Sequence, residues 1–93
     1  MDDSVQDLIA GCRKRHRQSQ LAMYRRFAPL VYPICLRIVG NVPEAEEAMQ
    51  DTFLKIFDKL DQYHDELCVE AWIRRIAVRT AIDYVSRRLP EEE

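Results

Sequence analysis

Glycine is scarce in this chain, with only two among 93 residues. A loop that wraps a nucleotide phosphate needs several glycines close together, so the sequence offers no such loop. The chain also contains no signal-peptide pattern and no apolar run long enough to cross a bilayer. We therefore expect a cytoplasmic protein with no membrane association. The 47% content of hydrophobic residues indicates a globular, helix-rich fold rather than a disordered chain.

Cysteine is also sparse, and no arrangement of it points to chemistry. Cys12, Cys35 and Cys68 are odd in number and widely spaced, which favours free thiols over a disulfide framework. His64 and Cys68 stand four residues apart and could begin a metal site or a thiol–base pair. No second pair of histidines or cysteines supports either interpretation. We therefore expect no metal, no cofactor and no catalytic residues.

The net charge of −2 argues against a tight, purely electrostatic DNA binder, but the charge is unevenly distributed. Basic residues cluster at positions 13–17, 25–26 and 74–88, whereas positions 44–61 are mostly acidic. We expect a single domain over residues 1–89, with its core over residues 7–88. Residues 90–93 read Pro-Glu-Glu-Glu directly after a basic helix, and we interpret them as the start of a linker.

The first half of the chain predicts two helices. A short first helix carries Leu8 and Ile9, with Gly11 as its expected end, and residues 12–19 are expected to form a basic connector. Residues 20–39 show apolar positions at helical spacing, but Pro29 and Pro33 lie within this run. Because proline lacks a backbone donor, we expect a kink or a break near residues 28–29, with both prolines facing solvent.

The second half predicts two longer helices. Gly40 ends the preceding helix, and Asn41 caps a new one that has Pro43 in its first turn and extends to residue 60. A polar loop over residues 61–67 follows. The last helix, over residues 69–88, is apolar on most sides, and we take it as the element around which the others are organised. The predicted fold is all-α, a compact bundle of about four helices.

One apolar residue lies on the polar face of the helix over residues 44–60. Leu54 is flanked there by Glu47, Gln50, Asp51 and Asp58. A single exposed leucine is ordinary and requires no function. The other interpretation is an acidic docking patch with an apolar anchor, suited to a basic helical partner.

The last helix leaves a narrow polar strip that contains Arg75, Arg79 and Ser86, with Arg74 beside it. One interpretation is a solvated face with pairs at i,i+4, such as Arg79 with Asp83. The other places phosphates and base edges against this strip, with the loop over residues 61–67 beside it.

Two aromatic residues near this strip could stack on unpaired bases. Trp72 lies within the apolar arc of the last helix, so we expect it in the core. For Tyr63 both interpretations, core residue and base contact, remain open.

Three segments carry a family resemblance. They are residues 24–32 (YRRFAPLVY), residues 45–54 (AEEAMQDTFL), and residues 71–77 (AWIRRIA) followed by Ile82-Asp83-Tyr84. In this order and spacing they resemble region 2 of the extracytoplasmic-function (ECF) sigma factors, the promoter-recognition subunits of bacterial RNA polymerase. The resemblance covers roughly residues 7–88.

The resemblance implies a non-enzymatic transcription initiation domain. Its partners would be the RNA polymerase core, promoter DNA and an anti-sigma factor. The residues implied to dock on the clamp helices of the polymerase β′ subunit are Glu47, Gln50, Asp51, Leu54 and Asp58. Those implied to recognise and melt the promoter −10 element through its non-template strand are Tyr63, His64, Asp65, Glu66, Arg74, Arg75, Arg79, Asp83 and Ser86. The family also has a second helical domain, region 4, for which this chain has no match, so we expect the chain to be part of a longer protein.

One position departs from the family pattern. Arg79 stands where the family often has asparagine, which can both donate to and accept from a base, whereas arginine only donates. Arg79 would therefore read a different base, hold a phosphate, or pair with Asp83. Two alternatives to the whole interpretation stay open: a helical protein–protein interaction module without a DNA role, and an RNA-binding helical domain.

Overall fold

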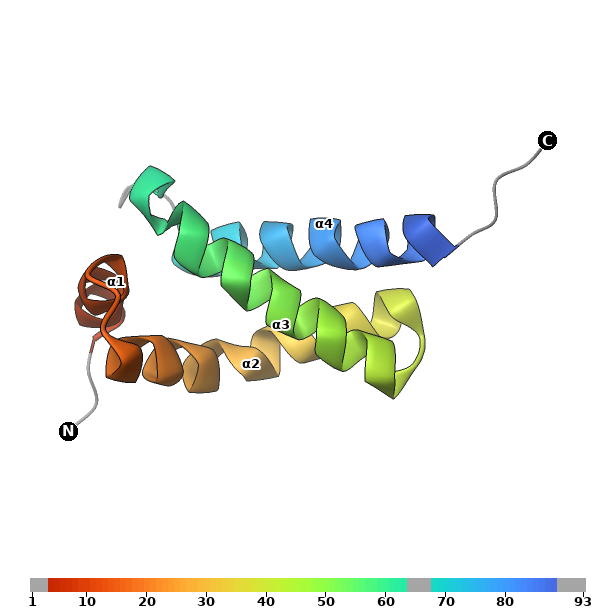
Figure 1. The fold of residues 1–93 in the computed structure, drawn as a ribbon, viewed down its shortest axis with the longest axis horizontal. Helices are drawn as coiled ribbons and strands as arrows, with labels where there is room; N and C mark the ends of the chain where they lie inside the picture. Colours follow the sequence, from red (N-terminus) through yellow and green to blue (C-terminus); the bar gives the residue numbers. More distant parts are fainter. Residues whose placement is uncertain (1–3, 64–67, 89–93) are drawn as a thin grey trace.

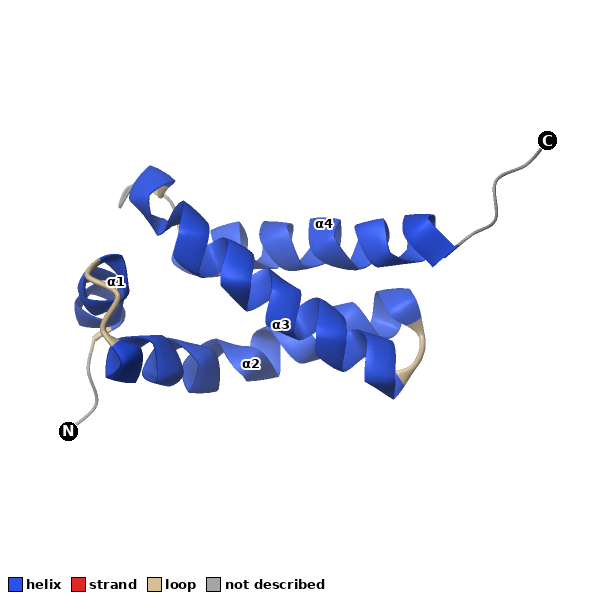
Figure 2. Cartoon of the chain, in the orientation of Figure 1, coloured by secondary structure: helices blue, strands red, loops and turns tan. Residues whose placement is uncertain are grey.

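The computed structural model describes residues 4–63 and 68–88. Its elements are α1 (Val5–Arg13), α2 (Arg17–Val39), α3 (Val42–Lys59), the single 3₁₀ turn η1 (Leu60–Gln62) and α4 (Val69–Arg88) (Figure 1). Within these residues there is no strand (Figure 2). The predicted all-α bundle of about four helices is confirmed. None of these helices is both long and apolar enough to cross a bilayer.

Three helices form the body of the domain. Each of α2, α3 and α4 packs against the other two, and α3 crosses in front of the other pair in Figure 1. The side chains between them recur at helical spacing; Val31 and Cys35 of α2, Ile56 of α3 and Ile73 of α4 are fully buried. The short α1 lies at one end, where it contacts α2 and η1.

The α2 helix continues through both of its prolines. The structure assigns one helix over Arg17–Val39, so the break expected near residues 28–29 does not occur. Pro29 and Pro33 are both exposed, as predicted, and they lie one turn apart on the solvent side. The packing of the opposite side of α2 against α3 and α4 compensates for the backbone hydrogen bonds that the two prolines remove.

The turn between α2 and α3 follows the prediction closely. Gly40 has φ 87°, a left-handed conformation that glycine adopts without steric cost, and its N–H donates to the Leu36 carbonyl at 2.9 Å. The next residue, Asn41, accepts the Glu44 N–H at 3.0 Å and donates from its side-chain amide to the Glu44 carboxylate. These two bonds form a reciprocal cap at the start of α3.

Gly11 has a different role from the predicted one. The α1 helix continues past it to Arg13, and Arg15, with φ 62°, provides the left-handed residue of the turn into α2. Gly11 is buried, and a Cβ placed on it would lie 1.9 Å from Ser19 Oγ and 2.6 Å from Ser19 Cβ. The missing side chain therefore allows α1 to approach the first turn of α2, and the connector shrinks to residues 14–16.

The contact at Gly11 predicts whether an alanine at this position raises or lowers the free energy of unfolding. Because the Ser19 Cβ cannot swing away, we expect Gly11→Ala to lower the free energy of unfolding by about 1–3 kcal/mol in urea denaturation. Helix propensity alone predicts the opposite, a gain of about 1 kcal/mol. Adding Ser19→Gly to the variant should recover most of the loss. A more stable Gly11→Ala protein would contradict the packing account.

Candidate functional site

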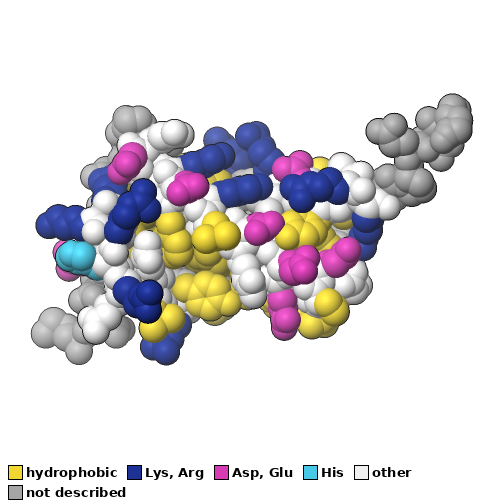
Figure 3. Space-filling view, viewed as in Figure 1, with side chains coloured by type: hydrophobic (Ala, Val, Ile, Leu, Met, Phe, Trp, Pro, Cys, Tyr) yellow, Lys and Arg dark blue, Asp and Glu magenta, His cyan; other side chains and the backbone are white. Residues whose placement is uncertain are grey.

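The residues expected to dock a partner share one side of α3. Glu47, Gln50, Leu54 and Asp58 are all exposed, and Leu54, at 64%, is more exposed than the other exposed large apolar side chains of the described residues. Acidic side chains gather over α3 in the space-filling view (Figure 3). We call Glu47, Gln50, Leu54 and Asp58 the docking face. It combines one apolar side chain with surrounding polar and acidic groups.

Asp51, the fifth expected docking residue, is directed toward α4. Its Oδ2 accepts a hydrogen bond of 2.6 Å from the hydroxyl of Tyr84. Burial raises the pKa of Tyr84 to about 12, and the bond to Asp51 and the carboxylates of Asp51 and Glu47 act in the same direction. Asp51 therefore contributes to the packing of α3 against α4.

A groove of about 210 Å³ lies between α3, η1 and α4. Basic, amide, hydroxyl and aromatic groups line it. Across the groove, Lys55 Nζ of α3 donates a hydrogen bond to Thr80 Oγ1 of α4 at 3.2 Å. We call this the basic groove. Its lining residues are Lys55, Lys59, Gln62, Trp72, Arg75, Ile76, Arg79 and Thr80.

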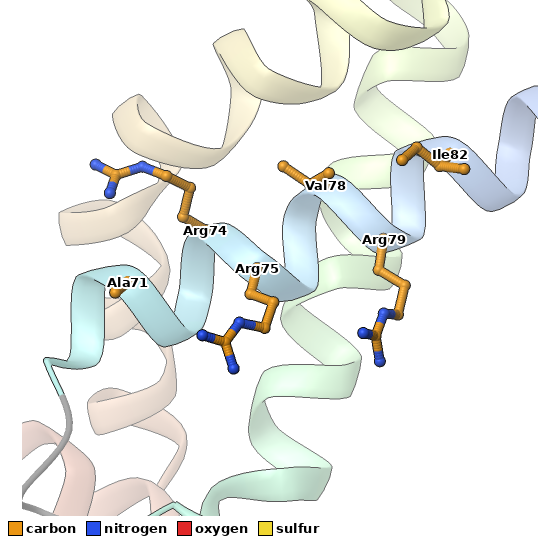
Figure 4. A pocket seen from close by; sticks show the side chains of 6 residues that line it. All are labelled: Ala71, Arg74, Arg75, Val78, Arg79 and Ile82. Atoms are coloured by element: carbon orange, nitrogen blue, oxygen red, sulfur yellow. The ribbon is translucent and has the colours of Figure 1, made fainter.

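The arginines of α4 point in different directions. Arg75 and Arg79 leave the helix on the same side, one turn apart, as Figure 4 shows in a view of a neighbouring pocket on α4. Both also line the basic groove. Arg74 leaves on the other side, where it lines a second hollow with residues of α2. No carboxylate within residues 4–63 and 68–88 lies at ion-pair distance from any of the three. The pair between Arg79 and Asp83 is therefore not formed.

The two arginines at the end of α4 stabilise the fold. The Arg87 guanidinium lies 5.4 Å from the centroid of the Tyr84 ring. Arg88 forms an ion pair with Glu44 and donates to the Val39 carbonyl at 2.7 Å, which ties the end of α4 to the turn before α3. Asp83 is half-buried and Ser86 is exposed; both lie farther along α4 than the lining of the basic groove.

Tyr63 and Trp72 pack against each other, with ring centroids 5.0 Å apart. Tyr63 is only 3% exposed, so this structure favours the core interpretation of that residue over the base contact. Trp72 is half-buried, packs against the core and also lines the basic groove. The expected contact residues His64, Asp65 and Glu66 lie outside the described residues.

Sequence reasoning did not select Lys55, Lys59 and Gln62. The two lysines are one turn apart within a mostly acidic segment, so the composition of that segment gives no indication of a basic site. Their spacing was the available signal, because i,i+4 places both on one side of α3. Only the packing of α3 against α4 shows that this side faces Arg75 and Arg79.

The geometry defines a class: a helical domain with an acidic face that contains an exposed leucine and, beside it, a basic groove whose arginines form no ion pair with any described residue. Comparison with known proteins gives the family. The sigma-70 region 2 family model matches residues 23–89, and the chain belongs to that family.

Relatives and a solved structure agree with this assignment. The chain is 29% identical over 86 residues to the ECF RNA polymerase sigma factor SigW of Bacillus subtilis, an alignment that covers 85% of this chain and 46% of SigW. It is 33% identical over 66 residues to the ECF sigma factor SigE of Mycolicibacterium smegmatis, covering 71% of this chain and 25% of SigE. This chain therefore spans less than half the length of these relatives. An engineered region 2 of sigmaE, solved by NMR in complex with GTAAAA, superposes with a TM-score of 0.84 at 25% identity, covering 98% of this chain and all of the other.

The bond between Asp51 and Tyr84 predicts a measurable contribution to stability. We expect Tyr84→Phe to lower the free energy of unfolding by about 1–2 kcal/mol at pH 7, because it leaves a half-buried carboxylate without its donor. Urea denaturation of both proteins measures this difference.

The same pair predicts a pH dependence. Because the folded protein keeps the Tyr84 proton at pH values where the unfolded chain loses it, this contribution is complete below pH 10.0, the ordinary tyrosine pKa. It is lost as the pH rises toward about 12. The stability difference between wild type and Tyr84→Phe should therefore shrink across this interval. A difference independent of pH would contradict the assigned bond.

Proposed function

We propose that this domain binds single-stranded promoter −10 DNA in the basic groove and docks on the β′ clamp helices of RNA polymerase through the docking face. The observation that carries the DNA part is the pair of guanidinium groups, Arg75 and Arg79, that line the groove beside Trp72 and have no ion-pair partner among residues 4–63 and 68–88. Membership of the sigma-70 region 2 family supports both parts. The sigmaE relative of the same fold was solved with the oligonucleotide GTAAAA.

The lining of the groove matches what a single strand requires. Phosphates attract the lysine and arginine groups on its two sides, and an unstacked base finds an aromatic wall at Trp72. Gln62 is exposed and both donates and accepts hydrogen bonds, so it offers a partner to base edges, whereas the Thr80 hydroxyl is buried and already accepts from Lys55. A basic rim with polar and aromatic groups inside distinguishes such a groove from a plain phosphate-binding patch.

Melting of the promoter would follow from capture rather than from catalysis. Removing one base from the duplex costs a few kcal/mol, whereas stacking on an aromatic side chain returns about 1–3 kcal/mol per base. Phosphate contacts to the groove supply the remainder. The domain would therefore hold an opened strand without performing a chemical step, which makes it a binding factor and not an enzyme.

Arg79 sets the base preference in this proposal. Its guanidinium offers only donors, so it pairs with a phosphate or with a base edge that presents acceptors, such as O6 and N7 of guanine. Because its side chain lies in the groove and has no ion-pair partner within the described residues, it is available for either contact.

The docking face supplies a separate contact to the polymerase. Leu54 would enter an apolar site on the clamp helices, while Glu47 and Asp58 would meet basic residues at the rim. Leu54 and Lys55 are consecutive residues, so their side chains leave α3 about 100° apart. This angle separates the two surfaces and allows both partners to bind at once.

One observation favours the alternative of an interaction module. The outer face of α4 combines Ile82, which is 49% exposed, with Ala71 and Val78 between the arginines (Figure 4). A protein helix could cover such a face without any DNA being involved. Single-stranded oligonucleotide binding distinguishes the two, because an interaction module would show none above a charge-matched control.

Leu54 provides the sharpest test of the docking face. We expect Leu54→Ala to weaken binding to a β′ clamp-helix fragment by about tenfold, since truncating an exposed apolar anchor removes a contact that exists only in the complex. Isothermal titration measures the affinity, and circular dichroism should show unchanged helicity. Leu21→Ala is the matched control, because Leu21 is 46% exposed on α2, away from the docking face. Equal affinity of wild type and Leu54→Ala would contradict the assignment.

Arg75 tests the basic groove. We expect Arg75→Gln to weaken binding of a single-stranded −10-like oligonucleotide and to reduce the slope of log K against log salt by about 0.7, the value for one lost phosphate contact. Arg25→Gln, which makes the same charge change at an exposed position of α2, should leave that slope unaltered. If both variants lose the same affinity, the groove has no special role and the net charge alone determines binding.

A further inference from the structure

Arg13, the last residue of α1, makes two hydrogen bonds to a segment about fifty residues away. Its Nε donates to the Leu60 carbonyl at 3.1 Å, and its Nη2 donates to the Tyr63 carbonyl at 2.8 Å. The Leu60 carbonyl also accepts the Tyr63 N–H at 3.2 Å. The planar guanidinium thus bridges the start of η1 and the residue just after it.

The bridged segment forms one wall of the basic groove. In the sequence Gln62 lies between Leu60 and Tyr63, whose carbonyls accept hydrogen bonds from Arg13, and its side chain lines the groove. Tyr63 packs its ring on Trp72, which lines the groove as well. Both the amide and the indole therefore depend on a short turn, and Arg13 is the side chain that ties this turn to α1.

We infer that Arg13 is a positioning residue for the basic groove: it fixes the turn from Leu60 to Tyr63 and thereby sets where Gln62 and Trp72 meet the DNA strand. It acts through these residues and is not among those that line the groove. The inference rests on the proposed DNA-binding function. It also gives α1 a role, because the helix supplies a support for a site built by α3, η1 and α4.

The chemistry requires arginine. The guanidinium presents several N–H donors in a rigid plane, so it can hold two carbonyls at once, whereas the ammonium of lysine acts as a point charge. A groove fixed before binding loses less conformational entropy when the strand enters. Removing Arg13 should therefore weaken DNA binding even though the charge of the groove itself is unchanged.

The experiment compares Arg13→Gln with Lys14→Gln, two neighbouring substitutions that make the same charge change. Lys14 is exposed and serves as the matched control. The probe is the single-stranded deoxyoligonucleotide GTAAAA, and fluorescence anisotropy measures its affinity. The second readout is the emission of Trp72, the only tryptophan in the chain. We expect Arg13→Gln to weaken binding about fivefold to tenfold and to shift Trp72 emission, with Lys14→Gln close to wild type in both.

Two further measurements separate positioning from stability. Binding to the β′ clamp-helix fragment should be unchanged in Arg13→Gln, because the docking face is on α3 and Arg13 contacts the turn that follows that helix. Arg13→Lys, which keeps the charge, should restore only part of the oligonucleotide affinity. If Arg13→Gln loses helicity, Arg13→Lys replaces it in the comparison, with the same expected direction.

The outcomes distinguish this inference from the proposed function. If wild type binds the oligonucleotide and Arg13→Gln binds equally well, or Trp72 emission does not move, the inference is wrong and the proposed function stands. Equal losses in Arg13→Gln and Lys14→Gln would also overturn it, because they indicate charge alone. If wild type itself does not bind single-stranded DNA, the proposed function fails and the inference fails with it.

Discussion

The packing of α3 against α4 is the contact on which both candidate surfaces depend. At one point along it, the Tyr84 hydroxyl donates to Asp51, and at another Lys55 donates to Thr80. Thr52 and Ile56 of α3 and Ala77 of α4 are buried as well. A shift between the two helices would open the basic groove, because its opposite walls belong to different helices. It would also turn the docking face relative to that groove.

This arrangement explains how a chain of net charge −2 can present a basic groove. Its charges are sorted by helix side: α3 presents Glu47 and Asp58 on one side and Lys55 and Lys59 on the next. Arg87 and Arg88 contribute to packing at the end of α4, whereas Arg75 and Arg79 have no carboxylate partner within the described residues. Local charge, rather than the total, therefore decides what each face can bind.

The parts of the fold that depend on neighbours in sequence were predictable. Helical spacing of apolar residues, the glycine at position 40 and the cap at Asn41 act within one or two turns, and the structure confirms them. The exposure of Leu54 was predictable for the same reason, because helical spacing alone places this residue on the polar face of its helix. The family assignment, made on three short segments in order, is also confirmed.

The parts that depend on tertiary contact were not predictable. Gly11 resembles a helix terminator in sequence, and only the approach of Ser19 shows that it is a packing residue. Arg13 lies in a run of basic residues, and nothing in that run indicates that its guanidinium bonds two carbonyls far along the chain. Only the packing of α4 against α3 shows that Lys55 and Lys59 line a groove together with the arginines of α4. The direction of Asp51, toward Tyr84, likewise comes from helix packing and not from spacing.

We propose that one helix, α3, carries two surfaces that bind different partners at the same time. A residue-resolved NMR titration of the isotope-labelled domain tests it most directly, first with GTAAAA and then with the β′ clamp-helix fragment added. We expect the oligonucleotide to move the signals of Lys55, Gln62, Arg75 and the Trp72 indole. The fragment should then move those of Gln50 and Leu54 while the first set stays shifted. Release of the oligonucleotide by the fragment, or shifts from both ligands on the same face, would contradict it.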